Sequence, residues 1–416
     1  MSDKIKIKNY GPLEIGTTEL DGGSMIVPKF TFFIGDQGTG KSTIAKLIST
    51  LSWTEKAMVR KTIDPKSLSF ETLAGLLLNQ NLPKDYFTNA TVIEYSGKAY
   101  TISISDKTVK VTANSEASDY LCPQIIYYPS ERNILSVMDN PWDVRGFPDM
   151  VYALASEYLN AQLSSGRRSK AFFNDYKIDF DPVSRQSFVQ DPEKKTRIPL
   201  SHASSGLQSV APLMVVSDYL TKKLHADLLD RMRNESIGTR SRIIEAVNDD
   251  ELKEKLRSFF SSTIKDVFTK EDLNELRAVA ERFVNTTLLQ IVEEPEQNLY
   301  PTSQVSAIRK LIQNTNSIGR LIVTTHSPYI LSAVNNFIFA YDLRGNIKKS
   351  PKGISKDEFI RYEDVSAYKI KDGRVFSILD DDARMIDVTE IDECSIDINK
   401  LFDKLMDIKE SIDEGQ

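Results

Sequence analysis

Runs of apolar residues bounded by polar turn residues mark the buried strands of this chain. Residues 30–34, 124–128, 288–292 and 321–324 form short runs rich in β-branched and aromatic side chains. Runs of this kind are typical of central parallel strands covered on both faces. Residues 302–314 lie between the last two runs and have helical spacing. The pattern therefore predicts an α/β core.

A second kind of strand shows alternating polar and apolar residues. Residues 4–10 alternate in this way and end at turn residues, Gly11 and Pro12. Alternation indicates strands with one solvated face, as in antiparallel sheets. Further strands of this kind are predicted at 91–95, 100–104 and 108–111, as a β meander, and at 177–181, 186–190 and 197–200.

Helical spacing fills most of the remaining chain. It is predicted over most of 55–90, over 149–175, and over 208–283 with breaks. We expect four parts. Residues 1–216 form the first part of the core with a β lobe, residues 217–285 a helical insertion, residues 286–378 the second part of the core, and residues 379–416 an acidic tail with helical spacing at 398–412.

Composition changes this picture little. Hydrophobic residues make up 40% and charged residues 27% of the 416 residues, which are globular values. No run approaches the ~18 apolar residues that a membrane helix needs, so we expect no membrane association. Cys122 and Cys394 cannot form a disulfide framework and lack metal-ligand spacing. The chain is therefore expected in the cytoplasm.

The formal net charge of −6 argues against strong binding of nucleic acid over the whole surface. It leaves open a local basic strip. The candidates are Arg167-Arg168-Lys170 and Lys194-Lys195-Arg197, for which scattered solvated side chains are the simpler interpretation. Nucleic-acid binding is thus possible in principle but not indicated by charge.

A glycine-rich loop supplies the most specific chemistry. It follows the strand at 30–34, precedes a helical run that starts at Ser42 and Thr43, and matches G-x-x-x-x-G-K-[ST], the phosphate-binding loop. Lys41 is predicted to reach the β- and γ-phosphates of ATP and the Ser42 hydroxyl to bind Mg²⁺. The predicted nucleotide-binding residues are Gly35, Asp36, Gln37, Gly38, Thr39, Gly40, Lys41, Ser42 and Thr43.

Two adjacent carboxylates follow the strand at 288–292. The carboxyl ends of strands in an open α/β sheet are where ligands bind. We predict that Glu293 helps to hold Mg²⁺ and that Glu294 orients and deprotonates the attacking water. A solvated acidic turn is the alternative interpretation.

Two further motifs suit the same chemistry. His326 ends the strand at 321–324 and is predicted to contact the γ-phosphate or the attacking water; a structural histidine is the alternative. Ser204, Ser205 and Gly206 open a helix, and a helix N-terminus is an anion site. Simple capping of the helix by Ser204 or Ser205 is the alternative there.

The order of phosphate loop, Ser-Ser-Gly turn, Glu-Glu strand and His strand resembles the ATP-binding-cassette (ABC) ATPases. Within them the chain is similar to the soluble branch of the overcoming-lysogenization-defect (OLD) proteins and the RecF- and SMC-type heads. The resemblance implies a P-loop NTPase fold: an ABC-ATPase head with a mixed central sheet, an antiparallel β lobe and a helical insertion. It also implies a homodimer in which Ser204, Ser205 and Gly206 reach the γ-phosphate in trans.

The sequence departs from that family at several positions. Glu293 replaces an aspartate, and Tyr300 replaces a histidine of the OLD-like pattern. The family usually has a glutamine at the lobe junction that contacts Mg²⁺, and its counterpart here is not evident. Gln124 precedes the predicted strand, whereas Ser130 and Glu131 follow it. Tyr10 suits either stacking on adenine or packing in the core.

The resemblance suggests an ATPase subunit that controls a separate effector, a nuclease or a toxin, in bacterial antiphage defence. Neither cysteine lies in a zinc hook, and residues 380–382 are interpreted as solvated surface rather than as a nuclease site. The alternatives are a RecF-like ATPase of DNA repair or DNA ends and a nucleotide-gated scaffold with negligible turnover. ATP and Mg²⁺ are the expected cofactors of the ATPase.

Overall fold

A six-stranded mixed sheet forms the centre of the molecule. The computed structural model describes residues 2–138, 146–262, 267–345 and 353–389. The strand order is β15-β14-β3-β13-β12-β7, and all neighbours are parallel except β14 and β15. Their bounds are β3 (Phe30–Ile34), β7 (Pro123–Tyr128), β12 (Thr287–Glu293), β13 (Gly319–Thr325), β14 (Val365–Lys371) and β15 (Arg374–Ser377).

The register of this sheet brings the carboxyl ends of three strands to one edge. Glu293 of β12 pairs with Thr324 of β13, and Thr325 pairs with Ile34 of β3. The glycine-rich loop, the carboxylates and the histidine each follow one of these ends. The four buried runs of the sequence are thus confirmed as β3, β7, β12 and β13.

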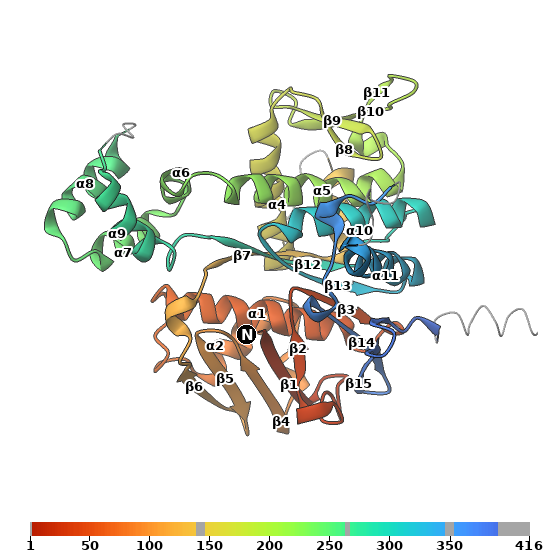
Figure 1. Cartoon of the computed structure of the whole chain (residues 1–416), viewed down its shortest axis with the longest axis horizontal. Coiled ribbons are helices and arrows are strands. Elements are labelled where there is room, and N and C mark those ends of the chain that lie inside the picture. Colours follow the sequence, from red (N-terminus) through yellow and green to blue (C-terminus); the bar gives the residue numbers. More distant parts are fainter. Residues whose placement is uncertain (1, 139–145, 263–266, 346–352, 390–416) are drawn as a thin grey trace, which may run out of the picture.

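Helices and a β lobe cover the two faces of the sheet (Figure 1). One apolar core joins one face to α4, α5, α10 and α11, and a second joins the other face to α1 and the lobe. Double coverage explains why the core strands read as continuous apolar runs. The helices are α1 (Lys41–Val59), α2 (Phe70–Leu78), α3 (Ile134–Val137), α4 (Asp149–Ser165), α5 (Ser205–Leu224), α10 (Pro301–Asn316) and α11 (Pro328–Asp342).

The β lobe is an antiparallel sheet of order β2-β1-β4-β5-β6. It confirms the predicted meander, although β4 begins at Phe87, earlier than expected. Its strands are β1 (Asp3–Tyr10), β2 (Met25–Val27), β4 (Phe87–Ser96), β5 (Tyr100–Ser105) and β6 (Thr108–Ala113).

The expected helix at 149–175 is wrong in its last third, after Ser165. Helix α4 ends at Ser165, and Gly166 follows with a φ of 55°. Glycine adopts a positive φ at little cost, which lets the chain leave the helix here, and the chain then pairs as β8 in a small antiparallel sheet. That sheet has the order β11-β10-β9-β8, with β8 (Lys170–Phe173), β9 (Tyr176–Asp181), β10 (Gln186–Gln190) and β11 (Arg197–Pro199).

The predicted helical insertion extends away from the central sheet (Figure 1). Its helices bury a small apolar core of their own, which includes Leu256 and Phe259. They are α6 (Leu228–Arg233), α7 (Ile237–Ala246), α8 (Asp250–Ser261) and α9 (Lys270–Ala280).

The remaining elements are β16 (Leu379–Asp380), β17 (Met385–Ile386) and the 3-10 turns η1 (Asp21–Gly23), η2 (Lys84–Tyr86), η3 (Ala117–Asp119), η4 (Ser130–Asn133), η6 (Leu200–His202), η7 (Leu343–Gly345), η8 (Lys356–Glu358) and η9 (Tyr362–Asp364).

Candidate functional site

The glycine-rich loop joins β3 to α1 and has the backbone of an anion cradle. Gly35, Gly38 and Gly40 have φ angles of 150°, 76° and 109°, which favour glycine. A Cβ on Gly35 would lie 2.3 Å from the Ile370 carbonyl oxygen. No side chain caps α1, and its first turn holds no acidic residue. The first amides of the helix and its positive end are therefore free to face a phosphate.

Lys41 lies at the base of this loop and is buried. Its ammonium group donates hydrogen bonds to the carbonyl oxygens of Gly35 and Asp36, both at 2.7 Å. Burial lowers the pKa of Lys41, and the nearby carboxylates of Glu294 and Asp36 oppose that shift. The lysine thus stands among opposite charges at the edge where β3 and β12 end.

Glu293 is buried at the end of β12, with both carboxylate oxygens engaged. Oε1 accepts a hydrogen bond from the Tyr127 hydroxyl at 2.5 Å, and Oε2 accepts one from the Ser130 amide at 3.2 Å. A carboxylate offers about four acceptor sites, so each oxygen retains a lone pair for a cation. Its role as a magnesium ligand, with Ser42, stays a prediction.

Glu294 has the geometry of a positioned carboxylate. Its φ is 44°, a left-handed conformation that costs a non-glycine residue energy and that occurs often at functional sites. Its amide donates to the Thr324 carbonyl at 2.8 Å. Its Oε1 lies 3.6 Å from Nε2 of His326, and its side chain remains partly exposed. The backbone is fixed while the carboxylate faces the edge of the sheet.

His326 follows β13, as the sequence predicted, and the structure places it beside Glu294. Burial lowers the pKa of His326, Lys41 lowers it further, and Glu294 and Asp36 oppose the shift. Above its ordinary value of 6.5 the imidazole is therefore neutral. A neutral imidazole has one donor and one acceptor nitrogen, so it can bridge two polar groups.

Glu296 is a third carboxylate of the site, to which the sequence analysis gave no role. Its Oε1 accepts hydrogen bonds from the His326 amide at 2.7 Å and the Thr325 hydroxyl at 2.9 Å. Its Oε2 is buried and has no hydrogen-bond partner among the described residues. Burial raises the pKa of Glu296. The only sequence signal was its place two residues after Glu294.

Arg132 is the second residue that sequence reasoning missed. It is fully buried, and its guanidinium donates to the carbonyl oxygens of Glu293 and Glu294, both at 2.7 Å. It also donates to the Pro129 carbonyl at 3.1 Å and the Ser209 carbonyl at 3.0 Å. One side chain therefore joins the end of β12 to the first turns of α5. An arginine in the turn after a buried strand was the available signal.

The Ser-Ser-Gly turn opens α5. The Ser204 hydroxyl accepts a hydrogen bond from the Leu207 amide and so caps α5. A Cβ on Gly206 would lie 2.8 Å from the Asn298 carbonyl oxygen, and the Asn298 amide group donates to the Ser209 hydroxyl at 2.9 Å. The turn thus packs on the loop after Glu294. Contact of Ser204, Ser205 and Gly206 with a γ-phosphate in trans stays a prediction.

Two open questions of the sequence find an answer. Tyr10 is fully buried and packs edge-to-face on Tyr86 and Phe87, so it belongs to the core and not to an adenine site. Gln124 lies at the amino end of β7 beside Asn285 and is therefore remote from the carboxyl edge. Only the turn at 130–131 reaches that edge, where the Ser130 amide contacts Glu293.

Two of the six cations in the candidate basic strips are paired with aspartates. Arg167 pairs with Asp181 at 3.0 Å, and Arg197 pairs with Asp179 at 2.7 Å. Lys170 has no carboxylate partner within ion-pair distance among the described residues. Burial lowers the pKa of Lys170, and the positive charges of Lys222 on α5 and of Arg168, just before β8, lower it further.

The described residues contain no helix that is both long enough and apolar enough to cross a membrane. Within the same ranges, no three histidine, cysteine or acidic side chains gather as a metal cluster. Residues 380–382 are exposed, as expected for a solvated run. Cys394 and the predicted helical spacing at 398–412 lie outside the described residues.

Neither a protein-family model nor a curated protein matches the sequence. Three of the similar solved structures are SMC heads. An SMC head domain from Thermotoga maritima is 10% identical, with a TM-score of 0.34 and coverage of 91% of this chain and 98% of that one. An SMC head bound to the C-terminal winged-helix domain of ScpA is 11% identical, with a TM-score of 0.37 and the same coverage.

The third is an SMC head domain with an extended coiled coil, bound to the C-terminal domain of ScpA from Pyrococcus furiosus. It is 10% identical, with a TM-score of 0.35, and the match covers 90% of this chain and 95% of that one. Likenesses this distant assign no residue a role.

The fold class rests on the chain's own arrangement. A glycine-rich loop between β3 and α1, a mixed central sheet, an antiparallel lobe and a helical insertion are the parts that were predicted. The chain therefore has the α/β architecture of a P-loop NTPase of the ABC-ATPase head type.

Proposed function

We propose that the chain binds ATP with Mg²⁺ at residues 35–43 and hydrolyses it as an ABC-type ATPase. The observation that supports this best is the convergence of three groups that follow three separate strands, β3, β12 and β13. Lys41, Glu294 and His326 interact at one edge of the sheet, with Nε2 of the histidine 3.6 Å from the carboxylate. A phosphate cradle beside a carboxylate and a neutral imidazole suits attack by water on a phosphoryl group.

Each group has a distinct task in this proposal. Magnesium, when bound with the nucleotide, neutralises charge between the β- and γ-phosphates. Ser42 and Glu293 would hold it, and Lys41 would bind the phosphate oxygens. Glu294 orients the attacking water and accepts its proton, and His326 donates a hydrogen bond to the γ-phosphate or to that water.

We further propose that two copies complete the site. In this arrangement Ser204, Ser205 and Gly206 of one protomer reach the γ-phosphate bound to the other. Nucleotide binding would then close the dimer and hydrolysis would open it. The hydrogen bonds from Arg132 to Glu294 and Ser209 support the idea, because they join the end of β12 to α5, the helix that the Ser-Ser-Gly turn opens.

The role in the cell follows by analogy with the family that the sequence resembles. We propose that the ATPase is a nucleotide-gated sensor or clamp in the cytoplasm that controls a separate effector, a nuclease or a toxin, in bacterial antiphage defence. A RecF-like role on DNA is the second candidate. The cations Lys170, Arg168 and Lys222 favour it, since they gather where the small sheet meets α5.

Turnover of ATP by the wild type and by Glu294→Gln, each with and without DNA, tests these proposals. We expect Glu294→Gln to lower turnover roughly 10²–10⁴-fold, the usual contribution of a general base, while ATP binding persists. Glu245→Gln, an exposed carboxylate of the insertion, is the matched control and should leave turnover unchanged.

Each result has a clear meaning. Unchanged hydrolysis in Glu294→Gln would refute its role as the base. Stimulation of the wild type by DNA would favour the RecF-like role over control of an effector. Tight ATP binding with negligible turnover by the wild type would favour a nucleotide-gated scaffold.

A further inference from the structure

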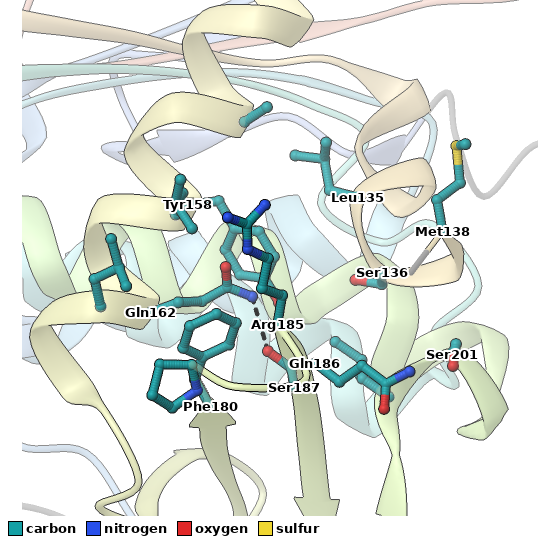
Figure 2. A pocket seen from close by; sticks show the side chains of 15 residues that line it. Leu135, Ser136, Met138, Tyr158, Gln162, Phe180, Arg185, Gln186, Ser187 and Ser201 are labelled. Atoms are coloured by element: carbon teal, nitrogen blue, oxygen red, sulfur yellow. Dashed lines mark hydrogen bonds between the residues drawn. The ribbon is translucent and has the colours of Figure 1, made fainter. Parts of the chain in front are cut away.

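A cavity of about 310 Å³ lies beside the Ser-Ser-Gly turn, outside the site described above (Figure 2). Helices α3 and α4, the small sheet and η6 enclose it. Its walls are mainly apolar, with Leu135, Phe180 and Leu200 among the buried side chains. A concave, mostly apolar pocket of this volume is within the range of sites for small molecules.

Polar groups without partners point to an occupant. The hydroxyl groups of Ser136 and Tyr158 line the cavity, are buried, and have no hydrogen-bond partner among the described residues. Buried hydroxyls without partners are uncommon in folded proteins. Gln162 donates to the Ser187 hydroxyl at 2.8 Å, drawn as the dashed line in Figure 2.

The ionisation of Tyr158 agrees with this. Burial raises the pKa of Tyr158, so its hydroxyl keeps its proton and can donate. Part of the rise in the pKa of Tyr158 is offset by the nearby side chains of Ser187, Gln162 and Ser136. None of them has hydrogen-bonding geometry to the Tyr158 hydroxyl. The Tyr158 hydroxyl is therefore a buried hydrogen-bond donor that an occupant of the cavity could use.

The charge of the lining is positive. Arg185 is the one charged residue among the described residues that line the cavity, and it extends over the opening toward Tyr158 and Gln162 (Figure 2). It forms no ion pair with any described residue, and none of the described residues that line the cavity is a carboxylate. An unpaired guanidinium at the mouth of an apolar cavity favours an anion with an apolar body.

We propose that this cavity binds a small organic anion, with its apolar body between α4 and the small sheet and its anionic group at Arg185. The hydroxyls of Ser136 and Tyr158 would hydrogen-bond polar atoms of the same molecule. A carboxylate and a phosphate monoester share the chemistry that Arg185 recognises.

The position of the cavity couples it to the turn that opens α5. Leu200 and Ser201 line it, and the Gln208 side chain of α5 donates to the Ser201 carbonyl at 2.8 Å. On the other side, α3 directly follows η4, which carries Arg132. An occupant would therefore contact both segments that flank the junction of α5 with β12. For this reason the occupant should alter ATP turnover, and this part of the proposal rests on the proposed ATPase activity.

Binding is tested with four probes of equal chain length: octanoate, octyl phosphate, octanol and octylamine, by calorimetry on the full chain. We expect an anion to bind and octylamine not to bind. The exposed Arg185 allows Arg185→Glu, which should weaken anion binding at least tenfold. Lys195→Glu is the matched control, because Lys195 is also an exposed cation with a positive φ on a turn of the same sheet but does not line the cavity.

The outcomes separate the possibilities. A preference between octanoate and octyl phosphate identifies the anionic group. Equal binding of octanoate and octylamine, no binding of either anion, or equal loss in both charge-reversal variants would overturn the proposal.

Turnover of ATP is then measured with and without the bound anion. We expect a change in the wild type that Arg185→Glu abolishes. Binding without any change in turnover overturns the coupling alone. If the wild type has no turnover, the proposed ATPase fails while the binding site stands.

Discussion

Replacement of Arg132 by lysine tests whether a buried cation holds the carboxyl end of β12 in place. The guanidinium donates to four backbone carbonyls, of Pro129, Ser209, Glu293 and Glu294, at 2.7–3.1 Å. Burial lowers the pKa of Arg132 to about 10, so it is charged at neutral pH. A lysine keeps the charge but lacks the planar fork that reaches several acceptors at once.

The expected magnitude follows from those contacts. Lysine can satisfy one or two of the four carbonyls, and each buried acceptor left without a donor costs about 1–3 kcal/mol. Because the surroundings relax, we expect Arg132→Lys to lower the free energy of unfolding by about 2–4 kcal/mol. The peptide between Glu293 and Glu294 loses its restraint, so the Glu294 carboxylate loses its position.

Loss of the position of the Glu294 carboxylate should lower kcat, whereas a loss of stability alone should not. Lys41 and the glycine loop do not contact Arg132, so ATP binding should persist while kcat falls at least about tenfold, as expected when a reacting group is misplaced. Urea unfolding, nucleotide binding and ATP turnover are measured on the same preparations. Arg320→Lys is the control, because Arg320 is a half-buried arginine near the amino end of β13, where it donates to the Val27 carbonyl at 2.9 Å.

Comparison of the two variants decides the matter. We expect both to lose stability and only Arg132→Lys to lose kcat. An equal loss of kcat in both variants, or a full kcat in Arg132→Lys, would refute the positioning role.

Two further predictions concern other parts of the chain. Burial raises the pKa of Glu55 from 4.5 to about 7. The folded chain therefore holds this proton longer than the unfolded chain, and the free energy of unfolding should fall by about 3 kcal/mol as pH rises from 4.5 through 7. Urea unfolding at several pH values should show this slope in the wild type and not in Glu55→Gln; the same slope in both would contradict it. Separately, Lys41→Ala and Ser204→Arg should each be inactive. Their equimolar mixture should recover about a quarter of wild-type turnover, because about half the dimers then pair the two variants and keep one intact seam. No recovery would show that Ser204 does not act in trans.

Local patterns in the sequence determined much of the site. The loop at 35–42 needs glycines at fixed spacing, and a strand must precede it and a helix follow it, so both its position and its backbone could be predicted. Glu294 and His326 each follow an apolar run, and parallel strands place such residues at one edge. The structure puts their side chains 3.6 Å apart.

Other features depend on contacts between distant parts of the chain. Helical spacing continued past Ser165, but the pairing of β8 with β9 prevailed over it, since strand pairing depends on a partner that local propensity does not include. Gln124 lies at the start of β7 and Ser130 follows its end, and only the direction of β7 in the sheet shows which of them reaches Glu293.

The sequence by itself thus determined the phosphate loop, the core strands and the order of the candidate site residues, because each is a short pattern with a local physical cause. Only the tertiary structure decided the partners of Arg132 and Glu296. Their hydrogen bonds reach carbonyl and amide groups up to about 160 residues away, and every residue type presents the same backbone groups. For this reason no spacing in the sequence could reveal these contacts before the chain was folded.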